Sequence, residues 1–461
     1  MSLSVSCNYA EPRPSPRLPT EICERIIDWV AAIPRSNNPF RLYEDPDAVK
    51  TLRACALACR AWTPRTQLHM FRILRINCSL NASGDINDFR ALLSRVPTLT
   101  SFISTVVAKG VENEISTLHI IPIILPLLLP QLTFLRLSGG LFHPGPGTFP
   151  SMRRFASVTR LSLSRVTFYS PQDLRRTIDA FKALQTLDIV HISWKPRSLP
   201  EDMPSRPFYC PRSAVQLLKL WISADRAWLM DTRSVQFVEW LAKSGILSSL
   251  VSFRLRWMMI LNSEMLAAVE MSIKAMASSA KDVTLHFGPD IEFKKGAYYR
   301  MALCFALRRF ISVYMVLNEC ARLRKVRIRI PYHSPMFLRA AELLAQLECR
   351  TLQEVWLYLE QYPGCTEPTA ADWGRLDRVI QQQKYSESTT AFYIMRQSFS
   401  VEGEIVWGDW YPDGSFDDNS FKETLQNLLP GTCRRDRPVL YYAACYRTDS
   451  QLEMKPVRDR M

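Results

Sequence analysis

The chain has 461 residues, of which 47 % are hydrophobic and 22 % are charged, and its formal net charge is +14. This composition is ample for a continuous core and normal for a soluble protein. The most apolar run, Ile120 to Leu129, is too short to span a bilayer and contains prolines, so we expect a buried connection there. Met1 to Pro16 is polar and proline-rich, without the features of a secretory signal.

Twelve cysteines are spread along the chain without a C-x-x-C pair, and the six histidines lie far apart. Neither residue type therefore forms the clustered ligand set that a metal ion requires. Several cysteines lie in apolar segments, where a free thiol behaves as a small hydrophobic group. We expect an intracellular protein, cytoplasmic, nuclear or both, without a metal or other cofactor.

Two apolar helical patterns lie near the N-terminus. The first has apolar residues at helical spacing, namely Ile22, Ile26, Val30 and Ile33, with Ile27 beside them. Pro19 suits the first turn of this helix, where its missing N–H group has no partner to lose. The second pattern places on one face Leu52, Cys55, Ala56 and Cys59, and Trp62 closes it. A third helix over about residues 64–71 would complete a small bundle.

The order Leu18-Pro19-x-Glu21-Ile22, followed by Leu52-x-x-Cys55 and Cys59-Arg60-x-Trp62, resembles the F-box, and in particular the F-box-like proteins of fungi. The F-box is the motif that docks the adaptor of cullin–RING ubiquitin ligases. The connection from Pro34 to Lys50 is longer than in a minimal F-box and is expected to be an inserted loop. The resemblance implies an adaptor-binding set that comprises Leu18, Pro19, Ile22, Ile26, Ile27, Leu52, Cys55 and Trp62. In the alternative interpretation, the same helices form an ordinary cap on a larger core.

A short apolar phrase recurs through the rest of the chain. It reads apolar, two residues, apolar, one residue, apolar, and its clearest copies are Leu132-x-x-Leu135-x-Leu137, Val158-x-x-Leu161-x-Leu163, Leu184-x-x-Leu187-x-Ile189, Val215-x-x-Leu218-x-Leu220, Leu250-x-x-Phe253-x-Leu255, Leu323-x-x-Val326-x-Ile328 and Leu352-x-x-Val355-x-Leu357. Weaker copies are Leu99-x-x-Phe102 and Ala280-x-x-Val283-x-Leu285. The central leucines 135, 161 and 187 are 26 residues apart, and later spacings are irregular.

This phrase resembles the core of leucine-rich repeats, which implies short parallel strands with helical returns. The returns are expected over 171–183, 234–243, 263–279, 298–320 and 335–347. The predicted fold class is therefore α/β: an N-terminal helical F-box followed by an irregular leucine-rich-repeat solenoid. A generic α/β domain with parallel strands is the alternative.

The predicted domain organisation has four parts. Residues 1–16 form a disordered N-terminus, 17–75 the F-box-like domain with the loop 34–50, 76–447 the solenoid with a C-terminal cap, and 448–461 a tail. Within the cap, strands are expected over 391–397, 404–410 and 438–446, and a helix over 420–429.

Motifs of the main enzyme classes are absent from the sequence: there is no G-x-S-x-G, H-E-x-x-H or P-loop. The acidic residues Asp409, Asp413, Asp417 and Asp418 lack the spacing of an EF-hand loop and are interpreted as a solvated turn. We therefore expect a protein that is not an enzyme.

Strand alternation predicts which side chains face away from the repeat core, along a concave lane. The first expected row is Arg136, Ser162, Asp188, Lys219, Arg254, Thr284, Arg327 and Trp356. The second is Ser138, Ser164, Val190, Trp221, Arg256, His286, Arg329 and Tyr358. Its basic and aromatic members form the predicted target-binding set: Arg136, Lys219, Trp221, Arg254, Arg256, Arg327, Arg329, Trp356 and Tyr358.

A basic, aromatic lane suits an acidic or phosphorylated protein target, because arginine pairs bidentately with carboxylate and phosphate. Together with the F-box resemblance, this predicts the substrate-recognition subunit of an SCF-type ubiquitin ligase, with a Skp-type adaptor as its partner and no membrane partner. Two alternatives remain: a leucine-rich-repeat scaffold without ligase coupling, and a binder of anions or nucleic acid. Arginines that merely solubilise the sheet face would explain the lane equally well.

Overall fold

The computed structural model describes most of the chain up to residue 398 and short pieces beyond it. The described residues are 19–32, 46–78, 83–111, 117–145, 147–195, 213–224, 228–229, 231–258, 263–288, 316–331, 334–361, 368–382, 390–398, 427–430, 440–442 and 455–456. The strand expected over 404–410, the acidic cluster 409–418 and most of the helix expected over 420–429 lie outside them. So do Leu18 and residues 33–45.

The internal contacts of the chain divide it into two compact units, residues 1–72 and 73–461. The predicted boundary between residues 75 and 76 falls inside the first strand of the second unit, β1 (Ile73–Asn77). Each unit is described by itself.

The first unit is helical. It contains α1 (Thr20–Ala32), α2 (Pro46–Ala58), the short 3-10 helix η1 (Arg60–Trp62) and α3 (Thr63–Phe71). Because α2 begins at Pro46, the end of the loop predicted over 34–50 is helical. Its small core consists of Ile27, Val30, Ala31 and Leu52, with Trp62 and Met70 packed against it.

The second unit is built on a sheet of thirteen described strands. In sheet order these are β1, β2 (Thr105–Lys109), β3 (Phe134–Ser138), β4 (Arg160–Ser164), β6 (Thr186–Val190), β8 (Lys219–Ser223), β9 (Ser252–Met258), β10 (Asp282–Gly288), β11 (Lys325–Pro331), β12 (Glu354–Gln361), β13 (Ala391–Ser398), β14 (Leu440–Tyr442) and β15 (Lys455–Pro456). Neighbouring strands pair in parallel, except for the antiparallel pair β14–β15. A second small sheet pairs β5 (Thr167–Phe168) with β7 (Ser193–Trp194).

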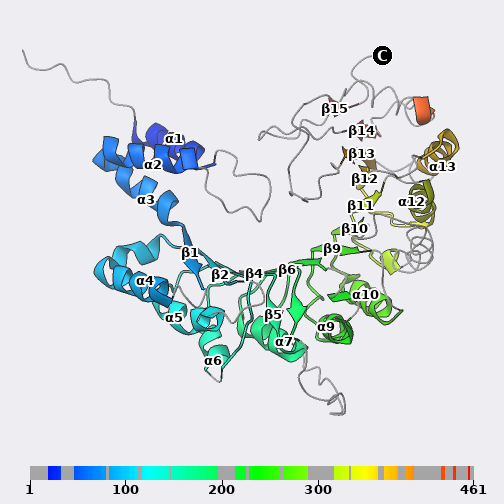
Figure 1. Cartoon of the computed structure of the whole chain (residues 1–461). Helices are drawn as coiled ribbons and strands as arrows, with labels where there is room; N and C mark the ends of the chain where they lie inside the picture. Colours follow the sequence, from blue (N-terminus) through cyan, green and yellow to red (C-terminus); the bar gives the residue numbers. More distant parts are fainter. Residues whose placement is uncertain are drawn as a thin grey trace, which may run out of the picture. The chain divides into compact units, whose positions relative to one another are not determined.

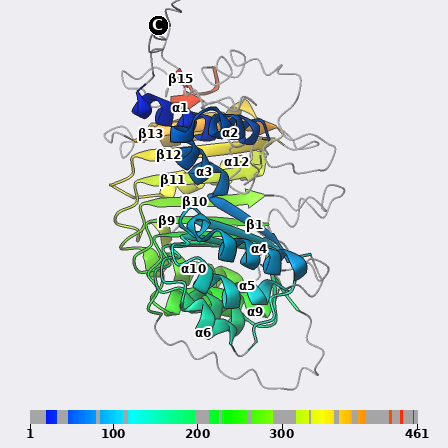
Figure 2. The same ribbon diagram turned by 90° about the vertical axis from the view of Figure 1, so that its left-hand side faces the viewer.

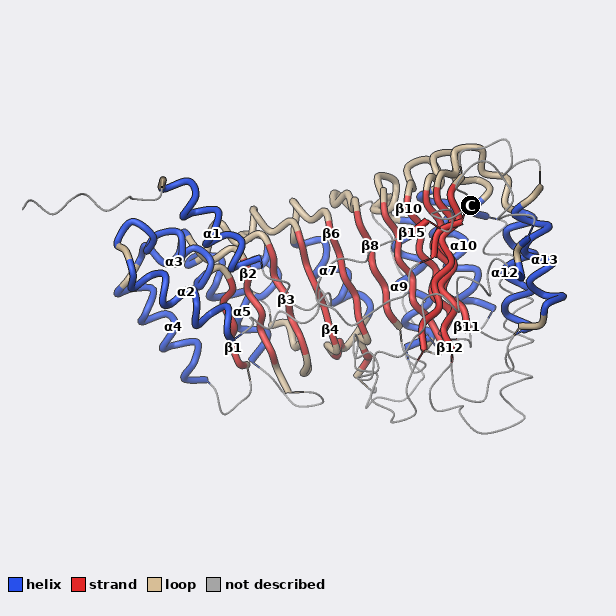
Figure 3. Tube along the Cα trace, turned by 90° about the horizontal axis from the view of Figure 1, so that it is seen from above, coloured by secondary structure: helices blue, strands red, loops and turns tan. Residues whose placement is uncertain are grey.

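Helices cover the convex face of the large curved sheet, and the opposite face is concave (Figure 1). The helical segments of this unit are α4 (Ser83–Arg95), η3 (Pro97–Ser101), η4 (Thr117–Ile120), α5 (Ile121–Leu128), α6 (Thr148–Met152), α7 (Pro171–Ala180), α9 (Thr232–Lys243), α10 (Ser263–Met276), α12 (Ser334–Gln346) and α13 (Ala370–Ile380). Strands β9 to β13 lie one beside the next (Figure 2), and the view from above shows the same for β1, β2, β3, β4, β6 and β8 (Figure 3). We call the face opposite the helices the inner face.

The core of the second unit lies between the sheet and the helices, and equivalent apolar residues are aligned across it. Leu135 pairs in register with Leu161, which pairs with Leu187, and all three are buried. The fold class is thus α/β with a large parallel sheet, as predicted, and the repeated strand–helix order is compatible with a solenoid. Most of the predicted phrases coincide with strands.

One predicted phrase is out of register. Strand β8 turns Leu220 and Ile222 toward the core, whereas Leu218, predicted to point inward, is 39 % exposed. A hydrogen bond that recurs between repeats identifies the first residue of each phrase. In it, a hydroxyl group that precedes one strand donates to the backbone carbonyl of this first residue in the preceding repeat. These bonds run from Ser157 to Leu132, from Ser249 to Leu217 and from Thr351 to Leu323, at 2.8, 3.1 and 2.8 Å. The phrase is therefore Leu217-x-x-Leu220-x-Ile222, two residues later than predicted.

Other differences from the sequence prediction are local. The weak copy at Leu99 and Phe102 belongs to η3 and the turn after it, and the strand follows at β2. Most of the proline-containing run 120–129 forms α5, despite Pro126 in the interior of the helix. The buried side chains of this helix are part of the core of the second unit. Strand β1 and helix α13 were not predicted. Helix α13 begins with a capping box in which Thr369 and Asp372 satisfy each other's backbone N–H groups.

Among the described residues, no helix is both long and apolar enough to cross a membrane.

Candidate functional site

Helix α1 has a second apolar stripe besides the one that faces the core. Cys23, Ile27 and Val30 are buried. On another side, Ile22, Ile26 and Trp29 recur at helical spacing and are 45 %, 46 % and 68 % exposed. On α2, Leu57 is 88 % exposed. Three large apolar side chains aligned on one helix are more than the scattered apolar residues that ordinary surfaces carry, and such patches mark interaction sites.

The described residues of the predicted adaptor-binding set therefore separate into three groups. Pro19, Ile22 and Ile26 are exposed, while Cys55 and Trp62 are partly buried. Ile27 and Leu52 are buried in the core of the helical unit, so they support the helices rather than present a surface. Trp29 and Leu57 are exposed apolar residues that the sequence interpretation missed. The helical periodicity of Ile22 and Ile26 contains the signal for Trp29.

An ion pair joins α1 to α3 beside this stripe. The carboxylate of Asp28 accepts hydrogen bonds from Nε and Nη2 of Arg65 at 2.7 and 2.6 Å. It also lies 2.8 Å from Nε2 of His69. The hydrogen bond from Arg65 is the largest cause that lowers the pKa of Asp28 to about 2, with smaller contributions from His69. The group fixes the orientation of α1, and with it the exposed stripe.

The inner face of the second unit carries two rows of side chains, set by the strand register. The first row runs Arg136, Ser162, Asp188, Trp221, Arg254, Thr284, Arg327, Trp356 and Tyr393. The second runs Ser138, Ser164, Val190, Ser223, Arg256, His286, Arg329 and Tyr358.

These rows correct the prediction at β8. Trp221 belongs to the first row and Ser223 to the second. Lys219 lies in neither row, because it pairs with Thr186 and Ser252 at the start of the strands. The error follows directly from the two-residue shift of the phrase.

The predicted target-binding residues come together only in part. Six of them lie close together on the consecutive strands β9 to β12, and they are Arg254, Arg256, Arg327, Arg329, Trp356 and Tyr358. Arg136 on β3 is separated from β9 by β4, β6 and β8. In the first row, the carboxylate of Asp188 lies between these regions and pairs with Arg160 at 2.8 Å. The basic, aromatic character is thus local to β9–β13.

Aromatic rings cluster at β12 and β13. Trp356 stacks on Tyr393 with ring centres 4.1 Å apart and planes 11° apart, and on Tyr358 at 6.1 Å. The indole N–H of Trp356 donates to Glu354 at 2.7 Å, and Glu354 also pairs with Lys325. Burial raises the pKa of Glu354, but the hydrogen bonds from Lys325 and Trp356 outweigh it, so that the pKa is lowered. The sequence interpretation missed Tyr393, although the alternation of Phe392 and Ile394 in β13 points to it.

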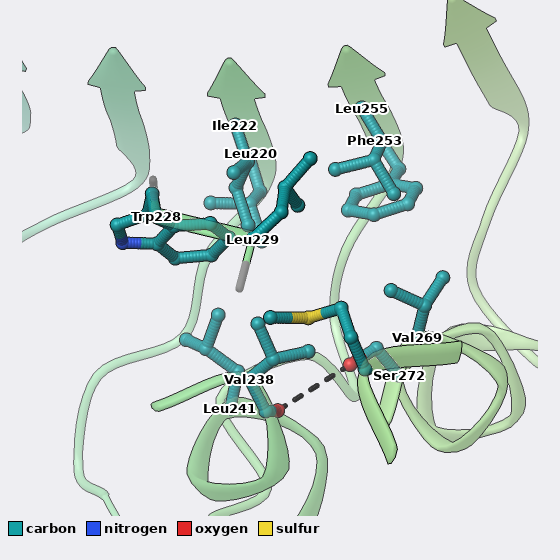
Figure 4. A pocket seen from close by; sticks show the side chains of 11 residues that line it. Leu220, Ile222, Trp228, Leu229, Val238, Leu241, Phe253, Leu255, Val269 and Ser272 are labelled. Atoms are coloured by element: carbon teal, nitrogen blue, oxygen red, sulfur yellow. Dashed lines mark hydrogen bonds between the residues drawn. The ribbon is translucent and has the colours of Figure 1, made fainter. Parts of the chain in front are cut away.

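An internal cavity between the sheet and helices α9 and α10 is not a ligand site (Figure 4). Its volume is about 10 Å³, and its lining is almost wholly apolar, with side chains such as Leu220, Phe253 and Val269. The hydroxyl of Ser272 at its edge donates to the backbone oxygens of Ala268 and Val238 at 3.0 and 3.5 Å. About 10–15 Å³ and several polar partners are needed to hold one water molecule. The cavity is a packing defect of the core.

The residues that the structure describes contain no group of three or more His, Cys, Asp or Glu side chains placed to hold a metal ion. The comparison with protein-family models gives no match for this chain, and neither does the comparison with curated proteins.

Proposed function

We propose that this chain is the substrate-recognition subunit of an SCF-type cullin–RING ubiquitin ligase. In this account the helical unit is an F-box that docks a Skp-type adaptor, and the second unit is an irregular leucine-rich-repeat domain that holds the protein target. Transfer of ubiquitin is carried out by other subunits. The contribution of this chain is to raise the effective concentration of the target beside them.

The observation that carries the proposal is the exposed stripe Ile22, Ile26 and Trp29 on α1, within a segment whose sequence resembles the F-box. Full burial of each such side chain on a partner is worth roughly 1.5–3 kcal/mol before the cost of association is subtracted. Three of them together contribute about 4.5–9 kcal/mol against the cost of association, and a helix that is already ordered adds no ordering cost to it. The ion pair of Asp28 with Arg65 helps to hold this helix against α3.

The second unit supports the other half of the proposal. Its strands present a long inner face with two registered rows of side chains, and basic and aromatic residues gather at one part of it. Arginine and aromatic residues are enriched at the energetic centres of protein–protein interfaces. This composition fits a protein target with an acidic or phosphorylated segment.

The test is co-purification of the full chain with a Skp-type adaptor. Ile26→Asp places a charge on the exposed stripe, and we expect it to abolish the complex while the chain stays folded. Gln172→Asp adds the same charge at an exposed position of α7 in the second unit and should leave the complex intact. Retention of the adaptor by Ile26→Asp would contradict docking through the exposed stripe. Absence of a complex with the folded natural chain would favour a scaffold whose helices have no ligase role.

A further inference from the structure

Four arginines surround two recessed residues on the inner face. Thr284 and His286 of β10 are both buried. Their register partners on the two neighbouring strands are all arginine: Arg254 and Arg256 on β9, and Arg327 and Arg329 on β11. Since neighbouring strands lie about 4.8 Å apart, β9 and β11 are separated by roughly 10 Å. We call these four residues the arginine cluster.

Among the described residues, the arginines of the cluster differ in their acidic partners. Asp282, at the start of β10, pairs with Arg327 at 3.1 Å, and the same Nη1 atom lies 3.3 Å from the hydroxyl of Thr284. Arg254 forms no hydrogen bond or ion pair with any residue that the structure describes. Displacement of water by its neighbours, and then the positive charge of Arg327, lower the pKa of Arg254. The guanidinium stays charged, and it lies beside positive charge that a bound anion would offset.

An aromatic wall adjoins the cluster on the side of β12. The guanidinium of Arg329 lies over the ring of Tyr358, 4.4 Å from its centre. The stacked rings of Trp356 and Tyr393 continue the wall to the next strand. Stacking of this kind orients a guanidinium while leaving its edge N–H groups for hydrogen bonds.

We propose that the arginine cluster binds a phosphate group on a phosphorylated segment of a protein partner, whose flanking side chains rest on Trp356 and Tyr393. A phosphorylated residue brings a charge close to −2 and three acceptor oxygens, which match several converging guanidinium groups better than a single carboxylate does. This inference deepens the proposed function, on which its biological meaning rests, by naming the chemical class of the target.

The extent of the cluster favours a single phosphate group over a nucleic acid. A nucleic acid presents a charge at every nucleotide and needs a continuous basic track. Along the first row, however, the three residues directly before Arg254 are Ser162, Asp188 and Trp221, and one of them is acidic. In the second row, Val190 and Ser223 precede Arg256. The inner face has a focus of positive charge on β9–β11 and no such track along β4–β8.

The inference is tested with the full chain and two pools of random-sequence peptides that differ only in a central phosphoserine or serine. We expect the phosphoserine pool to bind more tightly and inorganic phosphate to compete with it. Arg254→Ala with Arg329→Ala should weaken binding of the phosphoserine pool about ten- to hundred-fold, from the loss of hydrogen bonds to a charged group. The serine pool should show no such change.

The control removes the same charge nearby. Lys281→Ala with Arg324→Ala removes two exposed cations that precede β10 and β11 and line a separate surface hollow with Arg322 and Thr351. Phosphopeptide binding should survive in this variant. Equal binding of both pools, an equal loss in the control, or tighter binding of a random single-stranded RNA pool would overturn the inference. Adaptor binding by the Arg254 and Arg329 variant should be unchanged, so failure of the ligase proposal is separately visible.

Discussion

Asp28 on α1 and Arg65 on α3 form a two-pronged ion pair, with Nε and Nη2 of the guanidinium 2.7 and 2.6 Å from the two carboxylate oxygens. The two residues are 37 positions apart in the sequence, so the pair holds two separate helices together. It is partly exposed, with side-chain exposures of 40 % for Asp28 and 36 % for Arg65. Its main effect is therefore on orientation, since water screens much of the attraction.

Replacement of this carboxylate should loosen the helical unit without unfolding it. For Asp28→Asn we expect a loss of about 0.5–1 kcal/mol in the local stability of α1 and α3, as for other partly exposed pairs. Hydrogen exchange of peptides from these helices in the full chain measures it. Peptides from β3 and β4 serve as the internal control and should exchange as in the natural sequence.

The same pair gives a pH dependence with a defined sign. The pKa of Asp28 falls from 3.8 to about 2 on folding, mainly because of the hydrogen bond from Arg65. Between these values the unfolded state binds more protons, so the contribution is complete above about pH 4 and is lost as the pH falls toward 2. The difference between the natural chain and Asp28→Asn should therefore shrink over that interval, after correction for intrinsic exchange rates. A difference that persists unchanged at pH 2 would contradict this assignment.

The corrected register at β8 can be tested with two adjacent leucines. Leu217 is buried, while Leu218 is 39 % exposed. We expect Leu217→Ala to destabilise the second unit by about 2–5 kcal/mol and Leu218→Ala by less than about 1 kcal/mol. Denaturant unfolding of the two variants, followed by circular dichroism, compares them. A larger loss of stability for Leu218→Ala than for Leu217→Ala would instead support the predicted phrase that begins at Val215.

Thiol reactivity should distinguish two cysteines. Burial, followed by the proximity of Cys349, raises the pKa of Cys320 to about 12. Because the thiolate is the nucleophile, Cys320 should resist alkylation at neutral pH in the folded chain. Cys59 is exposed and should react with iodoacetamide. Peptide mapping by mass spectrometry reads both sites at once, and denaturation should make Cys320 reactive.

The sequence predicted the strands well where the apolar residues fit the repeated phrase in only one register. Leu135, Leu161 and Leu187 recur every 26 residues, and their strands lie where the phrase puts them. Around β8, Val215, Leu217, Leu218, Leu220 and Ile222 satisfy two frames equally. Hydrogen bonding to the neighbouring repeat decides between them, and that information is not local in the sequence.

The candidate surfaces were predictable to the extent that alternation governs them. The period of two along each strand correctly grouped Arg254 with Arg327 and Arg256 with Arg329. It gave no sign that Asp282 compensates Arg327, because that contact depends on side-chain reach across strands. In the helical unit, periodicity placed Ile22, Ile26 and Val30 on a single apolar stripe of α1. Only packing reveals that Ile27 and Leu52 fill the core while Ile22 and Ile26 remain exposed.

Co-expression of the full chain with a Skp-type adaptor, followed by size-exclusion chromatography with light scattering, measures directly whether the two proteins form a complex. We expect a stable one-to-one complex that is lost when Ile22, Ile26 and Trp29 are replaced together by serine. Elution of the folded natural chain without the adaptor would contradict it.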